Sequence, residues 1–567
     1  MSAPFLNEIG FGSEDMIADH MGDMVNRCVA EHGDKSAFSC VLPTGHSASL
    51  TFKEVGHFSD AVAAFLREDL KLVPGDVIAI QSLNTLAYPV IAFGIAKAGL
   101  TITNVNPLYT PDETNHQLKD SGAKVLFVTE FFGDRVEQSI LHTRVERVYK
   151  LSLLDFFPAM QRRVLGFAMK YIKKLIPPYK GMLSGTMQSV IKIGERHLER
   201  GVDLAAYMHH VAPDDVAIYQ YTGGTTGRSK GAELTHSNMV ANISQGNKRV
   251  AGIERFDDDI LMLVLPLYHV YALSVGALNS MHNGCHVVLV PVPRPLKNLR
   301  PVFENFKITL LPGVNTLYLG LMQEEWFTNN PPRGLRICFS GAAPLQPATA
   351  DAWANLTGAE IYEGYGLTEG TCVISSMPFD QPPRRGTCGI PIPGTEVRIV
   401  SESGQDMPRG QPGELWLRGP QIMKGYLNNP EATAGSFDKD WLKTGDVATL
   451  DEDGYLSIVD RMKDMVIVSG FNVYPTDIED VLTRFDRIAE AAVVGTSDSI
   501  TGERVVAYVV PADKDLSEED IIRHCKQHLT NYKVPKTVCF VDELPKSPVG
   551  KVLRRELREQ AKELGTG

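Results

Sequence analysis

The chain has 567 residues and a formal net charge of −12, from 56 lysines and arginines against 68 aspartates and glutamates. An acidic chain of this kind repels the phosphate backbone, which excludes a nucleic-acid partner bound through general basicity. Hydrophobic residues make up 43% of the sequence, enough to bury a core. The length corresponds to about three or four compact units of roughly 150 residues each, so disorder is excluded for the bulk of the chain.

Targeting signals and disulfides are not expected. The first twenty residues contain no basic residue before an apolar run, so we expect no secretory signal. The most apolar stretch, residues 77–100, is interrupted by polar side chains and falls short of the roughly 20 apolar residues that are needed to span a bilayer. The 8 cysteines form no CxxC pair, which is typical of reduced thiols. The sequence therefore predicts a cytoplasmic protein.

Strand-like and helical patterns alternate through most of the chain. Short runs rich in β-branched residues occur at 77–80, 124–128, 260–265, 286–290 and 308–311. Helical patterns between them predict a multi-layer α/β fold with parallel strands. From about residue 388, glycines and prolines separate shorter strand-like runs. We therefore predict a large N-terminal domain, residues 1–459, with a β-rich subdomain at about 388–459.

The remaining residues, 460–567, show a third pattern. Helices are predicted at 475–485 and 517–529, and strands at 491–494, 505–510 and 537–541. This order predicts a small α+β C-terminal domain.

A glycine- and threonine-rich loop at 221–231, YTGGTTGRSKG, follows a strand-like run at 216–221. Glycines let backbone amides approach a phosphate, threonine hydroxyls add donors, and Lys230 adds a positive charge. The loop is not the common GxxxxGK[ST] sequence, because Lys230 lies three residues after Gly227. A helix is expected to begin within 233–238. The predicted phosphate-binding residues are Thr222, Gly223, Gly224, Thr225, Thr226, Gly227 and Lys230.

This loop resembles the phosphate loop of the acyl-adenylate-forming, or AMP-binding, enzymes. Later segments resemble further motifs of that family in the same order, at 266–270, 340–345, 363–369, 413–415, 444–446, 460–464, 469–475 and 545–551. Segments 104–110, 313–318 and 531–535 are especially similar to bacterial long-chain fatty acyl-CoA synthetases. Two departures are Gly223, where many relatives have serine, and Ser229, where many have proline.

The resemblance implies a ligase that activates a long-chain fatty acid with ATP and Mg²⁺. The acid forms acyl-AMP and pyrophosphate, and coenzyme A then displaces AMP to give acyl-CoA. A medium-chain acyl-CoA synthetase, a fatty acyl-AMP ligase that loads a carrier protein, a luciferase-like oxidoreductase and a non-catalytic lipid-binding protein stay open as alternatives.

Site residues are carried over from the family motifs. Thr222 and Glu369 would hold Mg²⁺, His269 would position the substrate carboxylate, and Lys551 would stabilise charge during adenylation. Lys463 would be the hinge between the two domains, and Gly470 would leave room for the pantetheine arm of CoA. The other expected nucleotide contacts are Gly341, Ala342, Ala343, Pro344, Glu363, Gly364, Tyr365, Gly366, Thr368, Asp446 and Arg461.

The acyl pocket is expected around Tyr271, Leu273, Gly313, Val314 and Gly366. Acetyl-type relatives carry a tryptophan at the position of Gly366, so the resemblance implies an open pocket here.

Residues 161–176 form an amphipathic helical pattern. Apolar residues recur at helical spacing from Leu165 to Ile176, and five lysines and arginines lie on the opposite side. Such a helix either lies on an anionic membrane or packs its apolar face on the protein's own core, and the sequence leaves both open. The predicted partners are thus a fatty acid, ATP and CoA, with peripheral membrane contact and a homodimer left open.

Overall fold

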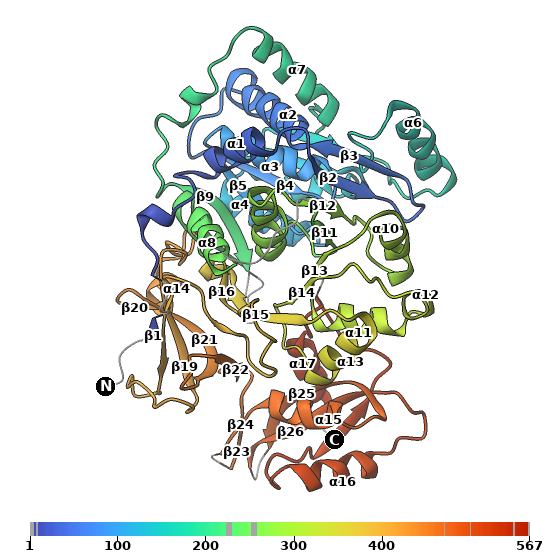
Figure 1. The fold of residues 1–567 in the computed structure, drawn as a ribbon, viewed down its shortest axis with the longest axis vertical. Coiled ribbons are helices and arrows are strands. Elements are labelled where there is room, and N and C mark those ends of the chain that lie inside the picture. Colours follow the sequence, from blue (N-terminus) through green and yellow to red (C-terminus); the bar gives the residue numbers. More distant parts are fainter. Residues whose placement is uncertain are drawn as a thin grey trace.

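The structure is a computed structural model that describes residues 5–6, 10–222, 229–250, 258–469, 471–498, 501–547 and 550–564. Two large sheets with helices around and between them form most of the molecule, and a smaller sheet and a separate C-terminal unit follow (Figure 1). The predicted α/β architecture is confirmed.

The seven-stranded sheet has the order β10-β9-β5-β4-β6-β7-β8. Its strands are β4 (Val77–Gln81), β5 (Thr101–Asn104), β6 (Val125–Thr129), β7 (Arg147–Leu151), β8 (Gly185–Thr186), β9 (Val216–Thr222) and β10 (Lys230–Thr235). The pairs from β9 to β8 are parallel, and only β9–β10 is antiparallel. The parallel strands predicted at 77–80 and 124–128 are thus confirmed.

The nine-stranded sheet has the order β17-β16-β15-β14-β13-β11-β12-β2-β3. Its strands are β2 (Ser36–Val41), β3 (Ser47–Thr51), β11 (Ile260–Leu263), β12 (His286–Leu289), β13 (Leu310–Gly313), β14 (Ile337–Ser340), β15 (Ile361–Leu367), β16 (Cys372–Ser376) and β17 (Ile390–Pro391). Its central pairs are parallel, and β16 pairs antiparallel with β15.

Helices fill the space between the two sheets. Every residue of α3 (Ala87–Lys97) is buried, and Phe93 on this helix contacts Phe38 of β2 with ring centroids 6.2 Å apart. The other helices of this part are α1 (Met21–His32), α2 (Phe52–Ala64), α4 (Pro111–Ser121), α5 (Val136–Ser139), α6 (Ala159–Phe167), α7 (Met187–Glu199), α8 (His236–Arg249), α9 (Asn279–His282), α10 (Arg300–Asn305), α11 (Asn315–Gln323), α12 (Glu325–Thr328) and α13 (Pro347–Thr357).

A helix begins within 233–238, as expected, but the first three residues of that range belong to a strand. Residues 233–235 belong to β10, which pairs with β9, and α8 begins at His236. Thr235 is its N-cap, since its hydroxyl accepts a hydrogen bond from the backbone of Asn238 at 3.0 Å. Pairing with β9 therefore outweighs the local helical pattern before this cap.

A six-stranded antiparallel sheet forms the β-rich subdomain. Its elements are β1 (Phe5–Leu6), β18 (Glu396–Val400), β19 (Gly413–Arg418), α14 (Pro430–Ser436), β20 (Phe437–Asp438), β21 (Trp441–Leu450) and β22 (Leu456–Arg461). Strand β22 continues to Arg461, where its register pairs it with Asp446 of β21. The sheet thus extends past residue 459.

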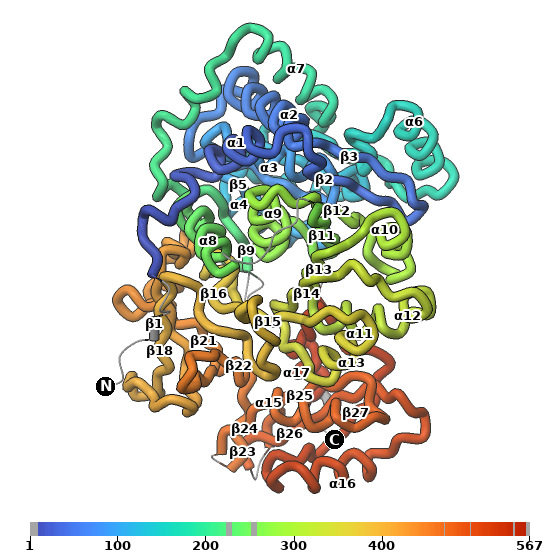
Figure 2. The backbone as a smooth tube through the Cα atoms, viewed as in Figure 1, coloured from blue at the N-terminus to red at the C-terminus, as the bar shows by residue number. Residues whose placement is uncertain are grey.

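The C-terminal unit has its own sheet and core. Its elements are β23 (Val466–Val468), β24 (Phe471–Val473), α15 (Pro475–Thr483), β25 (Ile488–Asp498), β26 (Gly502–Pro511), α16 (Glu518–His528), β27 (Thr537–Phe540) and α17 (Arg554–Leu564). Ile478, Val493 and Ile521 pack in a cluster separate from the main core. Figure 2 shows this unit, in orange to red, against the large domain.

The amphipathic segment predicted at 161–176 is helical over only part of that range. Helix α6 continues as a π-helical segment over Ala168–Ile172, and the helix ends there. Lys174 has a left-handed backbone with φ of 51°. No helix within the described ranges combines the length and apolar character that crossing a bilayer requires.

Candidate active site

A cavity of about 1320 Å³ lies where the large domain, the β-rich sheet and the C-terminal unit meet. Strands β9, β10, β15, β16, β21 and β22 and the turn before α17 contribute its lining. The predicted site residues that it brings together are Thr222, Lys230, His269, Tyr271, Gly341, Ala342, Glu363, Gly364, Tyr365, Gly366, Thr368, Glu369, Asp446, Arg461, Lys463 and Lys551.

The remaining predicted residues are not in that lining. Gly223, Gly224, Thr225, Thr226, Gly227 and Gly470 lie outside the described residues. Ala343, Pro344, Leu273, Gly313 and Val314 are described but do not line the cavity. Pro344 is exposed to solvent, so of the segment 341–344 only Gly341 and Ala342 line the cavity.

Asp446 is held by neighbours on both sides. Its carboxylate accepts a hydrogen bond from the Tyr365 hydroxyl at 2.6 Å, and Arg461 Nε lies 3.3 Å from its other oxygen. The backbone amide of Asp446 donates to Thr444 Oγ1 at 3.0 Å. A fixed carboxylate with two acceptor atoms suits the cis-diol of a ribose. The preceding residue, Gly445, has a φ of 71°, a backbone conformation that favours glycine.

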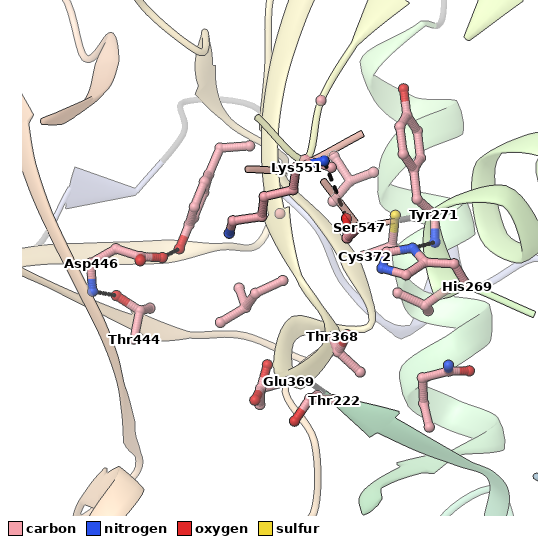
Figure 3. A pocket seen from close by; sticks show the side chains of 18 of the residues that line it. Thr222, His269, Tyr271, Thr368, Glu369, Cys372, Thr444, Asp446, Ser547 and Lys551 are labelled. Atoms are coloured by element: carbon pink, nitrogen blue, oxygen red, sulfur yellow. Dashed lines mark hydrogen bonds between the residues drawn. The ribbon is translucent and has the colours of Figure 1, made fainter. Parts of the chain in front are cut away.

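Lys551 projects from a tight turn into the cavity. Its backbone amide donates to Ser547 Oγ at 3.2 Å, and its carbonyl accepts from the Ser547 amide at 2.7 Å. Figure 3 shows its side chain extended toward Asp446. Burial lowers the pKa of Lys551 to about 7, and the nearby Arg461 also lowers it. The cavity thus contains an ammonium group that an anionic ligand would stabilise in its charged form.

His269 lies on the opposite side of Lys551 from Asp446 (Figure 3). Its Nδ1 accepts a hydrogen bond from the Tyr271 amide at 3.3 Å, which orients the ring. Burial lowers the pKa of His269 to about 4, and the charge on Lys551 contributes. A neutral imidazole suits the positioning role expected from the sequence. Cys372 also lines the cavity, and burial raises the pKa of its thiol to about 12.

Glu369 and Thr222 both line the cavity and are drawn next to each other, below Lys551, in Figure 3. Glu369 Oε1 accepts a hydrogen bond from the Tyr426 hydroxyl at 2.7 Å. The Tyr426 ring also contacts Lys230, whose Nζ lies 5.1 Å from the ring centroid. One tyrosine therefore contacts both a carboxylate and a cation at this end of the cavity.

Sequence reasoning did not identify Tyr426. The segment around it pairs with β10, because the Lys424 amide donates to the Glu233 carbonyl at 3.0 Å and the Leu427 amide donates to the Gly231 carbonyl at 2.8 Å. This contact joins the segment after β19 to β10. The tyrosine follows a glycine, Gly425, and only this long-range pairing distinguishes it from the other tyrosines of the chain.

Glu363 lies beside the cavity wall and accepts a hydrogen bond from the Leu345 amide at 3.0 Å. Burial raises the pKa of this carboxyl to about 8. Protonated at neutral pH, it can also donate a hydrogen bond into the cavity.

The glycine at position 366 is explained by strand packing and not by the open acyl pocket expected from the sequence. A Cβ built there would lie within 1.6 Å of the Cys372 carbonyl oxygen, since β15 and β16 approach closely at this point. The missing side chain therefore reflects strand packing, and any larger residue would displace β16. Gly366 lines the cavity, but its Cβ direction does not point into open space.

The expected pocket residues Leu273, Gly313 and Val314 lie behind the lining. Leu273 is buried in the core, and a Cβ at Gly313 would meet Leu317 and Tyr318. Val314 instead faces the turn that carries Lys551, because a Cβ at Gly550 would lie 3.1 Å from its side chain.

Another arm of the cavity runs between α8 and the segment Ala272–Leu278. Gly246, Val250, Val275 and Asn279 line it. A Cβ at Gly246 would meet nothing within 4 Å, so this glycine borders open space. Sequence reasoning did not select these residues, because the buried helix α8 carries no motif.

Lys463 lies at the junction between the two domains. Asp464 forms ion pairs with Arg554 and Arg558 of α17, and Arg558 also donates to the Lys463 carbonyl. On the N-terminal side of Lys463, the Asp460 carboxylate accepts a hydrogen bond of 3.0 Å from the amide of Thr476, which lies at the start of α15. The contacts around Lys463 are thus polar ones rather than apolar packing.

A family model described as "AMP-binding enzyme" matches residues 25–427. The chain therefore belongs to the AMP-binding enzyme family. The model described as "AMP-binding enzyme C-terminal domain" matches residues 477–551. A curated "Long-chain-fatty-acid--CoA ligase" of Yersinia pestis is 40% identical over 548 residues, which covers 96% of this chain and 95% of the relative.

Solved structures of the AMP-binding family have the same fold. The anthranilate CoA ligase AuaEII in complex with anthranoyl-AMP superimposes with a TM-score of 0.83 at 25% identity and covers 97% of this chain and 98% of its own. ATP-bound MatB from Rhodopseudomonas palustris has a TM-score of 0.78 at 28% identity, with 96% and 99% coverage.

Proposed function

We propose that this chain converts long-chain fatty acids to acyl-CoA with ATP. The acid and ATP form acyl-AMP and pyrophosphate, and the CoA thiol then displaces AMP. The observation that carries this proposal is the convergence of Lys551, Asp446 and Glu369 on one cavity. Curated long-chain fatty acid–CoA ligases at 40% identity over nearly the whole chain support the same reaction.

In the first step, a carboxylate oxygen attacks the α-phosphorus of ATP and the bond to pyrophosphate breaks. A fatty carboxylate is already ionised at neutral pH, so this step needs no base. Asp446 would hold the ribose, and Lys551 would offset the negative charge that the carboxylate and α-phosphate bring together. Neutral His269 would position the carboxylate without taking a proton.

Mg²⁺ fits the phosphate-binding end of the cavity. This cation prefers oxygen ligands and is usually held by one or two carboxylates together with substrate phosphates and water. The Glu369 carboxylate and the Thr222 hydroxyl supply such oxygens, and Lys230 adds positive charge from β10. When bound, Mg²⁺ would neutralise phosphate charge, while Tyr426 holds Glu369 in place.

In the second step, the CoA thiol attacks the acyl carbonyl and AMP leaves. We propose that the C-terminal domain turns about Lys463 between the steps, withdraws Lys551 and brings the loop of Gly470 to the cavity. The support is the position of Lys463 between Arg461, which pairs with Asp446 of β21, and Asp464, which pairs with Arg554 and Arg558 of α17.

The test of this function is CoA-dependent AMP formation across saturated acids from butyrate to stearate. We expect activity to require both ATP and CoA, to be accompanied by equal pyrophosphate, and to be greatest for long chains. Peak activity at eight to ten carbons would favour the medium-chain alternative. Acyl-AMP that reacts with a phosphopantetheinyl carrier protein but not with CoA would favour the carrier-loading alternative.

The alkaline pH dependence of adenylation should follow the deprotonation of the Lys551 ammonium group. Its pKa is lowered to about 7, so the free enzyme loses the ammonium charge as pH rises above that value. We therefore expect kcat/KM for pyrophosphate release to fall with a limiting slope of about tenfold per pH unit on the alkaline side. Thioester formation from supplied acyl-AMP should lack this limb. Lys551→Arg keeps its charge throughout and should flatten the profile; an unchanged limb in that variant would assign the titration to another group.

Tyr426→Phe should weaken the use of Mg²⁺. The variant removes the hydrogen bond to Glu369 and keeps the ring against Lys230, so we expect the Mg²⁺ concentration for half-maximal adenylation to rise about tenfold. Calorimetric titration of ATP with and without Mg²⁺ gives a second readout, in which only the Mg²⁺-dependent part of the affinity should fall. Tyr455→Phe is the matched control, because the Tyr455 hydroxyl bonds to Gln381 away from the cavity lining. An equal rise of the half-maximal Mg²⁺ concentration in both variants would contradict the role assigned to Tyr426.

We also propose that the enzyme works in the cytoplasm and contacts a membrane through the region of α6. All eight cysteines are free thiols, as expected in a reducing compartment. Long-chain acids partition strongly into lipid, so a ligase that uses them benefits from contact with that surface.

A further inference from the structure

Helix α6 and the segment after it present an apolar surface to solvent. Six large apolar side chains from this region are between 55% and 79% exposed. They are Met160, Val164, Phe167, Tyr171, Ile172 and Leu175. The first four follow one another at intervals of four, three and four residues, so they lie along one face of the helix.

This exposure is not the result of a loosely attached helix. Leu165 and Met169, from the other face, are partly buried against the main core. Gly166 also faces the body, since a Cβ there would lie 3.8 Å from Leu154. Helix α6 is thus anchored by one apolar face while a second apolar face stays uncovered. The apolar face expected from the sequence is divided in the structure: Leu165 and Met169 pack on the protein, whereas Ile172 and Leu175 are 66% and 55% exposed.

The charge of this region differs from that of the rest of the chain. Residues 156–194 contain seven lysines and arginines and no acidic residue, although the whole chain has a net charge of −12. Arg163, Lys170, Lys173 and Lys174 are exposed beside the apolar face. An anionic bilayer would be repelled by the protein as a whole but attracted by this region, which fixes the orientation of approach.

The aromatic side chains suit the interface between lipid headgroups and acyl chains. The Phe167 and Tyr171 rings lie 5.1 Å apart, and Lys170 Nζ lies 5.3 Å from the Tyr171 ring centroid. Aromatic rings flanked by lysines that reach back to the headgroups are typical of helices lying in this interface.

We infer that the face formed by Met160, Val164, Phe167, Tyr171, Ile172 and Leu175 inserts into the surface of an anionic bilayer, with the neighbouring cations on the lipid phosphates. This inference rests on the proposed membrane contact and assigns the surface that makes it. Charge complementarity selects an anionic lipid over a neutral one as the occupant.

The test is co-sedimentation of the full chain with vesicles of phosphatidylcholine containing 30% phosphatidylglycerol, and with phosphatidylcholine alone. We expect binding to the anionic vesicles, at least tenfold weaker binding to neutral ones, and a similar loss in Val164→Ser/Phe167→Ser/Ile172→Ser. The matched control is Val73→Ser/Leu108→Ser/Leu141→Ser, since these three side chains are 55% to 60% exposed elsewhere. Activity on water-soluble decanoate should be unchanged in both triple variants.

A second readout uses Phe167→Trp with brominated lipids, which quench tryptophan only at close range. We expect stronger added quenching than in Leu141→Trp. Failure of the parent to bind vesicles would contradict membrane contact itself, and binding that survives the α6 substitutions would contradict the assigned face. A concentration-dependent dimer in sedimentation that these substitutions abolish would show that a second copy covers the face instead.

Discussion

Lys551→Ala is expected to lower the rate of acyl-AMP formation about 10²–10³-fold, the effect of removing one preorganised charge-stabilising donor. Its ammonium is the group of the C-terminal domain that extends into the cavity toward Asp446. Thioester formation from supplied palmitoyl-AMP and CoA should stay within about twofold, because the proposed second pose withdraws this residue.

The two half-reactions are measured separately, as pyrophosphate release without CoA and as AMP release from synthetic palmitoyl-AMP. Lys533→Ala is the control, since this lysine pairs with Asp477 in the same domain and does not line the cavity. Gly470→Leu should show the opposite pattern, with adenylation kept and thioester formation lost. Equal loss of both half-reactions in Lys551→Ala would contradict the two-pose mechanism.

Gly246→Phe is expected to shorten the range of acids that the enzyme accepts. The side chain would enter the arm between α8 and Ala272–Leu278, where a Cβ at Gly246 has open space. Excluding about three methylenes at ~0.8 kcal/mol each removes ~2.4 kcal/mol, or about sixtyfold in kcat/KM for palmitate. Decanoate should be affected little, because it does not reach the filled part.

The measurement compares kcat/KM for palmitate and decanoate in both proteins. Gly435→Phe is the matched control, because Gly435 also lies in a helix with open space at its Cβ and is outside the cavity lining. An unchanged preference for palmitate in Gly246→Phe would show that the acyl chain takes another route. Gly366→Trp is not a usable probe, since its Cβ would collide with the β16 backbone.

Residues carried by local motifs could be predicted from the sequence, and residues defined by long-range packing could not. Asp446, Glu369 and Lys551 each lie in a short recognisable segment, and all three line the cavity. Tyr426 is placed in the cavity by pairing with β10, and Gly246 by the face of a buried helix, so neither has a local signal.

The same distinction explains why the structure differs from the sequence-based expectations at Gly366 and in α6. A side chain's direction depends on the neighbouring strand, and the sequence alone does not reveal how closely β16 approaches Gly366. It also does not reveal which of two apolar faces of α6 meets the core. The predicted helical period grouped Ile172 and Leu175 with Leu165 and Met169. In the structure Leu165 and Met169 pack on the core, whereas Ile172 and Leu175 are exposed to solvent.

The most direct test of the central claim follows the oxygen atoms of palmitate labelled with ¹⁸O in both carboxylate positions. Attack on the α-phosphorus followed by thiol attack on the acyl carbon leaves one labelled oxygen on phosphorus. After complete conversion with ATP and CoA, mass spectrometry should therefore find one ¹⁸O in each AMP, one in each palmitoyl-CoA and none in pyrophosphate. Formation of ADP with ¹⁸O in orthophosphate would contradict the acyl-AMP route and assign the cavity to an acyl-phosphate mechanism.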